Sequence, residues 1–392
     1  MNASLTNLPS DAVLKRFLVV GVSALLVSLA GLFFDRQQFF RSYLTAYLFM
    51  IGFPLGSLAI LMLHHLVGGR WGFVTQRLLE ASVRTFPLAA VLFLPLIFGM
   101  GDLYLWARPE VVVADPILQQ KSVYLNAPFF WARTAIYFAL WIGVSQLLCK
   151  WSLDQDRTAD VSLTQRLQTL SGPGLVLYGL TVTFSAMDWV MSIEPHWYST
   201  VYGLMFMVSD ALAALALVIC VASFLVTRGP LSQAAGRDQF HDLGNLLLAL
   251  VMLWAYLGFS QFMIIWMENL REEIPWVLRR TAGGWKFIVL LLVACQFALP
   301  FLLLLGRATK RNARLLAAVA LLIIFMHWIE VHWLVAPAFH PHGFYIHWLD
   351  FAALIGIGAI WLAVFLWRLE GRSLLPLHDP RFAEEIERAQ RV

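Results

Sequence analysis

Residues 199–226 read STVYGLMFMVSDALAALALVICVASFLV, and this stretch decides the fold class. Asp210 is its only charged residue. About 20 helical residues cross a hydrocarbon core of about 30 Å, so the stretch is long enough to span a bilayer once. The sequence therefore predicts an integral membrane protein with an acid deep in one span.

The composition of the whole chain agrees with this prediction. Its 392 residues are 60% hydrophobic and 13% charged, and the mean hydropathy is +0.72. A soluble domain carries about 25% charged residues, and so little polar surface cannot cover this many apolar side chains. A soluble enzyme, a secreted disulfide scaffold and a disordered chain are excluded. The 16 Trp residues fit helix ends at membrane interfaces.

Ten apolar runs predict an all-α protein with ten transmembrane helices. The first is interpreted as a retained helix because it lacks a small-x-small signal-peptide cleavage site. Residues 1–370 are expected to form a single ten-helix transmembrane domain, residues 371–392 a charged cytoplasmic tail that is helical on the surface, and residues 71–84 an interfacial helix. The predicted spans are 15–34, 42–66, 86–106, 130–151, 172–192, 199–226, 242–267, 284–305, 314–336 and 346–368.

Basic residues set the predicted orientation. With both termini cytoplasmic, 19 of the 28 Lys and Arg residues fall in or beside cytoplasmic segments. Arg271, Arg279 and Arg280 lie in one outer loop against this trend.

Cysteine usage limits the cofactors. Cys149, Cys220 and Cys295 lie in separate apolar runs, and no Cys-x-x-Cys-His sequence is present. An iron–sulphur cluster normally needs four thiolates, and covalent haem attachment needs that motif. We therefore expect no covalently bound cofactor and no metal site. The net charge of +4 is spread through membrane-flanking loops, so no nucleic-acid partner is expected.

The fifth predicted span carries a polar stripe. Tyr178, Thr181, Ser185, Asp188 and Ser192 are separated by steps of three and four residues, which places them on one helix face. Such a stripe can hold a file of water that passes a proton to Asp188. It can equally be a packing seam with one capped acid.

Further titratable groups follow in the next loop and span. Pro195 should end the fifth helix, so the short loop holds Glu194 and His196 near Asp188 at the outer surface. Asp210 is expected near the middle of the bilayer, where a buried acid is either paired or suited to proton transfer. We take Asp188, Glu194, His196 and Asp210 as proton-transfer candidates.

The ninth predicted span adds three more candidates. His327 and Glu330 are three residues apart and share a face, whereas His332 points about 140° away from His327. The two histidines therefore cannot bind one metal from a regular helix. A carboxylate beside an imidazole suits proton acceptance from a hydroquinone, and it also suits a plain buried ion pair.

Three residues at or near the outer ends of other spans are weaker candidates for the surroundings of a quinone. They are Asp102 in the third span and Gln261 and Glu268, which share a face of the seventh. Titratable groups thus collect at the outer ends of spans three, five, seven and nine. This pattern indicates an outer chemical site with a proton route inward.

Three segments carry a family resemblance. Residues 187–200, MDWVMSIEPHWYST, resemble a long, specific motif of a membrane subunit of alternative complex III, the bacterial quinol:cytochrome c or quinol:oxidase oxidoreductase. Residues 253–262, with Trp266 and Asn269, and residues 327–337 are similar to the same subunit. Length and motif resemble the smaller of its two such subunits, quinone-binding subunit 2, which belongs with the polysulfide-reductase-like (NrfD-type) family.

The resemblance implies an architecture and a set of partners. It implies ten helices, eight of them in two four-helix bundles and two peripheral, in the bacterial inner membrane. Such subunits hold no haem or iron–sulphur cluster of their own. The implied partners are a sister ten-helix membrane subunit, an iron–sulphur subunit, multihaem cytochrome c subunits, quinol and the lipid bilayer. The better supported quinol site of the family lies in the larger sister subunit.

The leading hypothesis is therefore a membrane subunit of a quinol:acceptor oxidoreductase that contributes to quinol binding, proton transfer or both, while partners carry the electrons. A stand-alone proton-coupled transporter or channel and a purely structural anchor stay open. A b-type cytochrome is disfavoured because the histidines inside spans lie at different membrane depths.

Overall fold

The structure is a computed structural model that describes residues 11–227, 236–341, 343–370, 373–376 and 379. Ten helical segments are long and apolar enough to cross a membrane, as predicted. The described residues contain no β-strand. The ten segments are Asp11–Phe34 (α1), Arg36–Val67 (α2), Arg70–Leu103 (α3 to α5), Ala127–Thr158 (α8), Ser162–Ile193 (α9 and η3), Tyr202–Val226 (within α10), Arg237–Glu268 (α11), Trp285–Leu305 (α13 to α14), Ala313–Phe339 (α16) and Trp348–Leu369 (α17).

Short elements complete the chain. Two helical elements interrupt spans: the 3-10 segment η1, Leu94–Gly99, and the π-helical segment η4, Leu292–Ala298. The remaining short helices are α3 (Arg70–Val83), α4 (Phe86–Phe93), α5 (Met100–Leu103), η2 (Leu105–Ala107), α6 (Pro109–Ala114), α7 (Pro116–Lys121), η3 (Met191–Ile193), α12 (Ile274–Thr281), α13 (Trp285–Leu291), α14 (Leu299–Leu305) and α15 (Arg307–Arg311).

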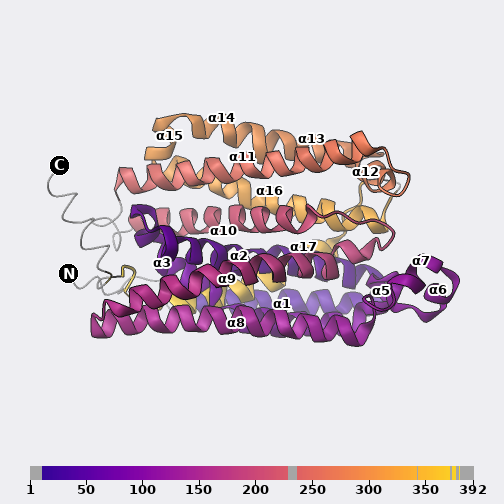
Figure 1. Cartoon of the computed structure of the whole chain (residues 1–392), viewed down its shortest axis with the longest axis horizontal. Coiled ribbons are helices and arrows are strands. Elements are labelled where there is room, and N and C mark those ends of the chain that lie inside the picture. Colours follow the sequence, from indigo (N-terminus) through magenta and orange to yellow (C-terminus); the bar gives the residue numbers. More distant parts are fainter. Residues whose placement is uncertain (1–10, 228–235, 342, 371–372, 377–378, 380–392) are drawn as a thin grey trace.

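The long helices lie side by side along the long axis of the molecule (Figure 1). Helices α6, α7 and α12 gather at one end, here called the α6 end. Helices α3 and α15 lie at the opposite end, here called the α15 end.

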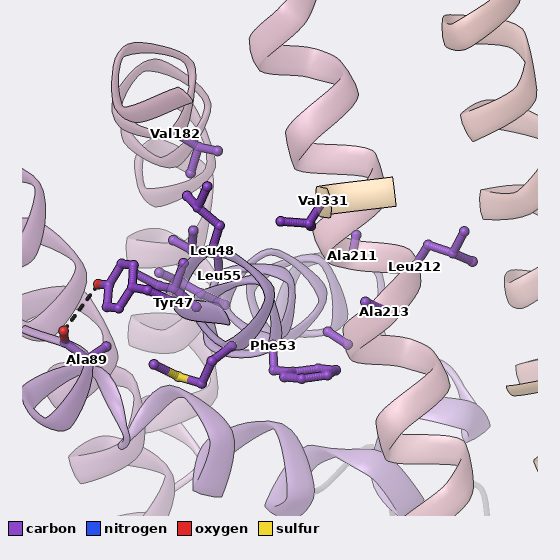
Figure 2. Packing of buried hydrophobic residues seen from close by; sticks show 14 of the residues in the cluster. Tyr47, Leu48, Phe53, Leu55, Ala89, Val182, Ala211, Leu212, Ala213 and Val331 are labelled. Atoms are coloured by element: carbon purple, nitrogen blue, oxygen red, sulfur yellow. Dashed lines mark hydrogen bonds between the residues drawn. The ribbon is translucent and has the colours of Figure 1, made fainter. Parts of the chain in front are cut away.

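Helix α2 is the centre of the packing and contacts α3, α9, α10, α16 and α17. In Figure 2 its side chains meet those of α4, α9, α10 and α16, and the Tyr47 hydroxyl donates to the carbonyl of Ala89. Gly52 and Gly56 let α10 approach closely, because a Cβ on Gly56 would overlap the backbone of Asp210. Small residues four apart are a common way to bring membrane helices together.

The segment predicted to lie at the membrane interface is instead buried. Every residue from Gly72 to Val83 of α3 is buried, and α3 contacts α2, α10, α11 and α17. Arg77 is 4% exposed because it pairs with Glu80 of the same helix and with Asp156 of α8. Neutralising the arginine in this way makes its burial possible.

The eighth span changes its helical winding where it meets a proline. Segment η4 is π-helical and ends immediately before Leu299, and Pro300 follows. Proline has no N–H for the carbonyl of Gln296 and its ring crowds that carbonyl, which accounts for a local change of winding.

The predicted charged tail, residues 371–392, lies almost wholly outside the described residues. Of its described part, residues 373–376 are not helical, and Leu374 and Leu375 are buried. The prediction of a surface helix therefore does not hold for residues 373–376.

Candidate functional site

Four polar side chains from α10 and α16 meet inside the bundle. Ser209, Asp210, His327 and Glu330 are each at most 5% exposed. The Ser209 hydroxyl donates to Glu330 Oε2 over 2.5 Å and lies 3.0 Å from His327 Nδ1. The Nδ1 atom is also 3.6 Å from Glu330 Oε2. The structure thus brings together three residues that the sequence marked as proton-transfer candidates.

The hydrogen bonds of Ser209 assign a tautomer to His327. Because the hydroxyl hydrogen is used on Glu330, the ring must donate its Nδ1–H to the Ser209 oxygen. The other ring nitrogen, Nε2, has no hydrogen-bond partner within the described structure. A neutral His327 therefore presents Nε2 as a proton acceptor.

Gly52 of α2 lies where Asp210 and His327 approach one another. A Cβ on this glycine would be 2.7 Å from Asp210 Oδ1 and 3.0 Å from His327 Nε2. The carboxylate of α10 and the imidazole of α16 therefore flank one point on α2. The absence of a side chain at position 52 makes room for both.

Asp210 also borders two cavities of water size. One of about 10 Å³ is lined by Ser209, His327 and Glu330 as well as Asp210. Another of about 10 Å³ lies toward α9, where Ser185 is part of the wall. A volume of about 10–15 Å³ is the smallest that holds one water molecule. Asp210 therefore lies between two cavities, each with about the volume of one water molecule.

Glu330 links this cluster to a much larger cavity. Its Oε1 accepts a hydrogen bond of 2.7 Å from the indole N–H of Trp254 in α11. Both residues line a cavity of about 660 Å³ formed by α10, α11, α12, α13, η4 and α16. Small-molecule sites have volumes of about 300–1,000 Å³ and mostly apolar walls with a few polar groups.

The other polar groups in the cavity wall come from α11 and α12. Gln261, a predicted candidate, is 4% exposed and accepts a hydrogen bond of 2.5 Å from Ser199. Arg280 is 2% exposed and lies over the Trp276 ring at 4.1 Å. The cavity therefore combines an acid, an amide and a guanidinium with aromatic walls.

Asp188 lies elsewhere and is fully paired. Arg133 of α8 donates two hydrogen bonds of 2.8 Å to its carboxylate, and the Tyr137 hydroxyl adds a third of 2.8 Å. The Arg133 guanidinium also lies over the rings of Tyr124 and Phe129, at 3.8 and 4.3 Å. This geometry fits the capped acid of a packing seam, since the ionised form has every partner it needs.

In the loop after α9, three consecutive residues, 194–196, each make polar contacts with other parts of the chain. Glu194 pairs with Arg279 and Arg280 of α12 at 2.6 Å each. The Pro195 carbonyl accepts from Lys121 of α7 over 2.6 Å, and His196 lies 2.6 Å from Asp115. These contacts make the residues 194–196 a clamp between α7 and α12.

The contact with His196 also lowers the pKa of Asp115. Desolvation raises the pKa of Asp115, but hydrogen bonds from His196 and from the amides of Leu118 and Ile117 outweigh it, so the net pKa is lowered. The carboxylate form of Asp115 is therefore the favoured partner of His196.

The remaining predicted residues lie apart from the cluster. His332 donates from Nε2 to the Tyr345 carbonyl over 3.0 Å and does not meet His327. Asp102 pairs with Arg36 over 2.9 Å, and Glu268 is exposed at the end of α11. Within the described residues, no group of three or more His, Cys, Asp or Glu side chains is arranged to hold a metal ion.

Sequence reasoning missed several important residues. Arg133 carried a usable signal, since an arginine inside a predicted span requires a partner. Arg280 stood against the orientation trend and Trp254 lay in a segment of the family resemblance, but neither signal gave a role, because the roles depend on which helices pack together. A second buried network joins Gln76, Glu80 and Ser152 by hydrogen bonds of 2.6–3.1 Å and was also missed.

Neither a protein-family model nor a curated protein matches the chain. The ten apolar helices indicate a multi-pass membrane protein.

Proposed function

We propose that the chain is a membrane subunit of a bacterial quinol-oxidising respiratory complex of the alternative complex III type. In this proposal it transfers protons released from quinol, while an iron–sulphur subunit and multihaem cytochrome c subunits carry the electrons. One observation carries the proposal. Glu330, Ser209, His327 and Asp210 form a buried set, and Glu330 also lines the cavity of about 660 Å³.

The chemistry of hydroquinone oxidation suits this arrangement. Oxidation of a hydroquinone to a quinone releases two protons and two electrons. Glu330, on the cavity wall, is placed to accept a proton from a hydroxyl. Ser209 bridges Glu330 to His327, whose Nε2 lies on the side of Asp210. Because both hydrogen bonds donate toward Glu330, transfer of its proton onward requires the Ser209 hydroxyl to turn to Nδ1 after the imidazole has changed to the tautomer protonated on Nε2. The electrons leave to the metal centres of partner subunits.

The proposal includes the ten-helix plan implied by the resemblance. The spans of α2, α3 to α5, α8 and α9 would form one four-helix bundle. Those of α10, α11, α13 to α14 and α16 would form the other, and α1 packs against α17 at the periphery.

The proposal includes cytoplasmic termini, the inner membrane and a sister ten-helix subunit. Asp188 and Glu194 are left out of the proton route because arginines neutralise both.

A stand-alone proton-coupled transporter is the second candidate. The observation that favours it is the position of Asp210 between two cavities of water size. Proton flux into liposomes that contain only this chain would support this alternative.

The proposal is tested by purifying a tagged copy from native membranes in mild detergent. We expect c-type haem absorbance, iron and acid-labile sulphide, and a second ten-helix subunit in the purified material. Recovery of the chain alone, or as a homo-oligomer, overturns the proposal.

A further inference from the structure

A further cavity of about 430 Å³, here called the α8–α9 pocket, lies between the end of α8 and the beginning of α9. It lies at the α15 end, because Asp156 near the end of α8 pairs with Arg77 of α3 (Figure 1). Its volume is within the range of small-molecule sites, about 300–1,000 Å³. Its wall is formed by Trp151, Ser162, Gln165, Arg166, Thr169 and Leu170.

The polar groups of this pocket suit a phosphate. Among the described residues that line it, Arg166 is the only charged one. Trp151 and Gln165 add an indole N–H and an amide, and Ser162 and Thr169 add hydroxyls. A guanidinium matches the geometry of a phosphate group and forms charge-assisted hydrogen bonds with it. The pocket therefore provides a cation and further polar groups for one phosphate.

Asp160 places a negative charge beside the pocket wall. Its two carboxylate oxygens accept hydrogen bonds of 2.9 Å each, one from the backbone N–H of Ser162 and one from the Ser162 hydroxyl. These bonds lower the pKa of Asp160, and the charge of Arg166 lowers it further, with desolvation opposing. Asp160 is exposed, and each oxygen keeps a lone pair that can accept from a ligand.

The same face of α9 becomes apolar toward the middle of the span. Arg166, Thr169, Val176 and Leu180 are separated by steps of three, seven and four residues, which places them on one helix face. Val176 and Leu180 are 65% and 54% exposed. Val176 lies about 15 Å along the helix from Arg166, which is half of a hydrocarbon core of about 30 Å. A ligand in the pocket can therefore lay an apolar chain on α9 across one leaflet.

We propose that the α8–α9 pocket holds the head group of a phospholipid with a primary ammonium, as in phosphatidylethanolamine. The phosphate accepts hydrogen bonds from the Arg166 guanidinium, and the ammonium donates to the Asp160 carboxylate. Trp151 lines the pocket at the level of the head group, where indoles are common in membrane proteins. The acyl chains lie on Val176 and Leu180. The site is separate from the proton route and does not rest on the proposed function.

Three other occupants fit the pocket less well. A purely anionic head group, as in phosphatidylglycerol, would lie beside the Asp160 carboxylate with no cation to pair with it. The quaternary ammonium of phosphatidylcholine has no N–H to donate to Asp160. A free inorganic phosphate makes no contact with the apolar face of α9.

The test is native mass spectrometry of the protein purified in mild detergent. The protein is titrated in turn with phosphatidylethanolamine, phosphatidylcholine and phosphatidylglycerol that carry the same acyl chains. Lipids also bind elsewhere on a membrane protein, so the site is measured as the difference between the wild-type chain and variants of the pocket. The wild-type chain should bind phosphatidylethanolamine most tightly.

Two matched pairs of variants make the test specific. Arg166→Gln should lower the affinity for phosphatidylethanolamine about tenfold, because it removes charge-assisted hydrogen bonds to the phosphate. Arg157→Gln should leave this affinity unchanged, since Arg157 is exposed on α8 but does not line the pocket. Asp160→Asn keeps an oxygen that accepts from Ser162, yet it should abolish the preference for phosphatidylethanolamine over phosphatidylcholine. Glu110→Gln, an exposed position of α6, should keep this preference. Equal effects within either pair contradict the proposal.

The lipid titrations and one competition experiment also decide between the occupants. Tighter binding of phosphatidylglycerol than of phosphatidylethanolamine, with no loss in the Asp160→Asn chain, overturns the assignment of a primary ammonium. Displacement of the bound lipid by an excess of inorganic phosphate in the wild-type chain makes the pocket a site for a soluble anion and overturns the lipid assignment. Phosphatidylethanolamine that stays bound in excess phosphate supports the proposal.

Discussion

The carboxylate of Asp210 and the imidazole of His327 approach each other across Gly52, although 117 positions separate them in the sequence. A Cβ on the glycine would lie 2.7 Å from the first and 3.0 Å from the second. The two groups belong to α10 and α16, and a third helix, α2, carries the glycine. Their relative position is thus set by helix packing.

Replacement of Gly52 by alanine should disturb this arrangement. The added methyl group has no room beside Asp210 Oδ1, so overpacking should destabilise the protein by about 1–3 kcal/mol. Thermal unfolding in detergent measures the change. Gly179→Ala is the control, because a Cβ there meets no atom within 4 Å and alanine favours a helix. Equal stability of the two variants would mean that the space around Gly52 is not restrictive.

The ion pair between Arg133 and Asp188 should be among the most sensitive in the protein. Asp188→Ala leaves a buried arginine without its partner, which typically costs about 3–5 kcal/mol. Asp102→Ala breaks a pair whose arginine side chain is 60% exposed, and should cost at most about 1 kcal/mol. Denaturation of both variants in parallel checks the contrast, and a small loss for Asp188→Ala refutes it.

The stability of the α6 end should depend on pH through His340. Burial lowers the pKa of His340, and Arg41 lowers it further, with Asp350 opposing. The folded pKa therefore lies below the unfolded value of about 6.5. The unfolded chain then binds more protons as the pH falls through this value, so stability is full above it and decreases below.

The measurement is the unfolding temperature between about pH 8 and about pH 5.5, on either side of the histidine reference pKa. The wild-type chain should lose stability toward low pH, and His340→Gln should lose less, because glutamine does not titrate. Gln38, 3.3 Å from His340 Nε2, gives either side chain a hydrogen-bond partner. An identical pH dependence in both proteins contradicts the assignment.

The sequence predicted all ten spans because length and hydropathy are properties of a continuous segment. It misplaced residues 71–84 because burial of Arg77 requires Asp156, a residue of another helix. The polar stripe that ends at Asp188 was visible, yet its partner Arg133 was not considered. The burial of Arg77 and the pairing of Asp188 both depend on contacts between helices. A single sequence does not reveal which helices touch.

In the candidate site too, the features set within one helix were predictable and those set by contacts between helices were not. Periodicity placed His327 and Glu330 on one face and separated His332 from them, in agreement with the structure. The link to Ser209 and Asp210 depends on contact between α10 and α16. Two predicted candidates, Gln261 and Glu330, line the cavity, but its shape could not be foreseen because six elements form its wall.

Glu330 is the residue whose replacement tests the proposed route most directly. Glu330→Gln keeps an oxygen that accepts from Trp254, but it removes the carboxylate that would take a proton. Loss of a general base typically lowers the rate by about 10²–10⁴-fold, so quinol oxidation by the purified complex should fall by about 100-fold or more. Glu268→Gln is the matched control, since Glu268 lies exposed at the end of α11. Haem content and subunit composition show whether each complex has assembled. Full turnover by an assembled Glu330→Gln complex would contradict the route, because Glu330 is the acid by which the proposed route meets the cavity.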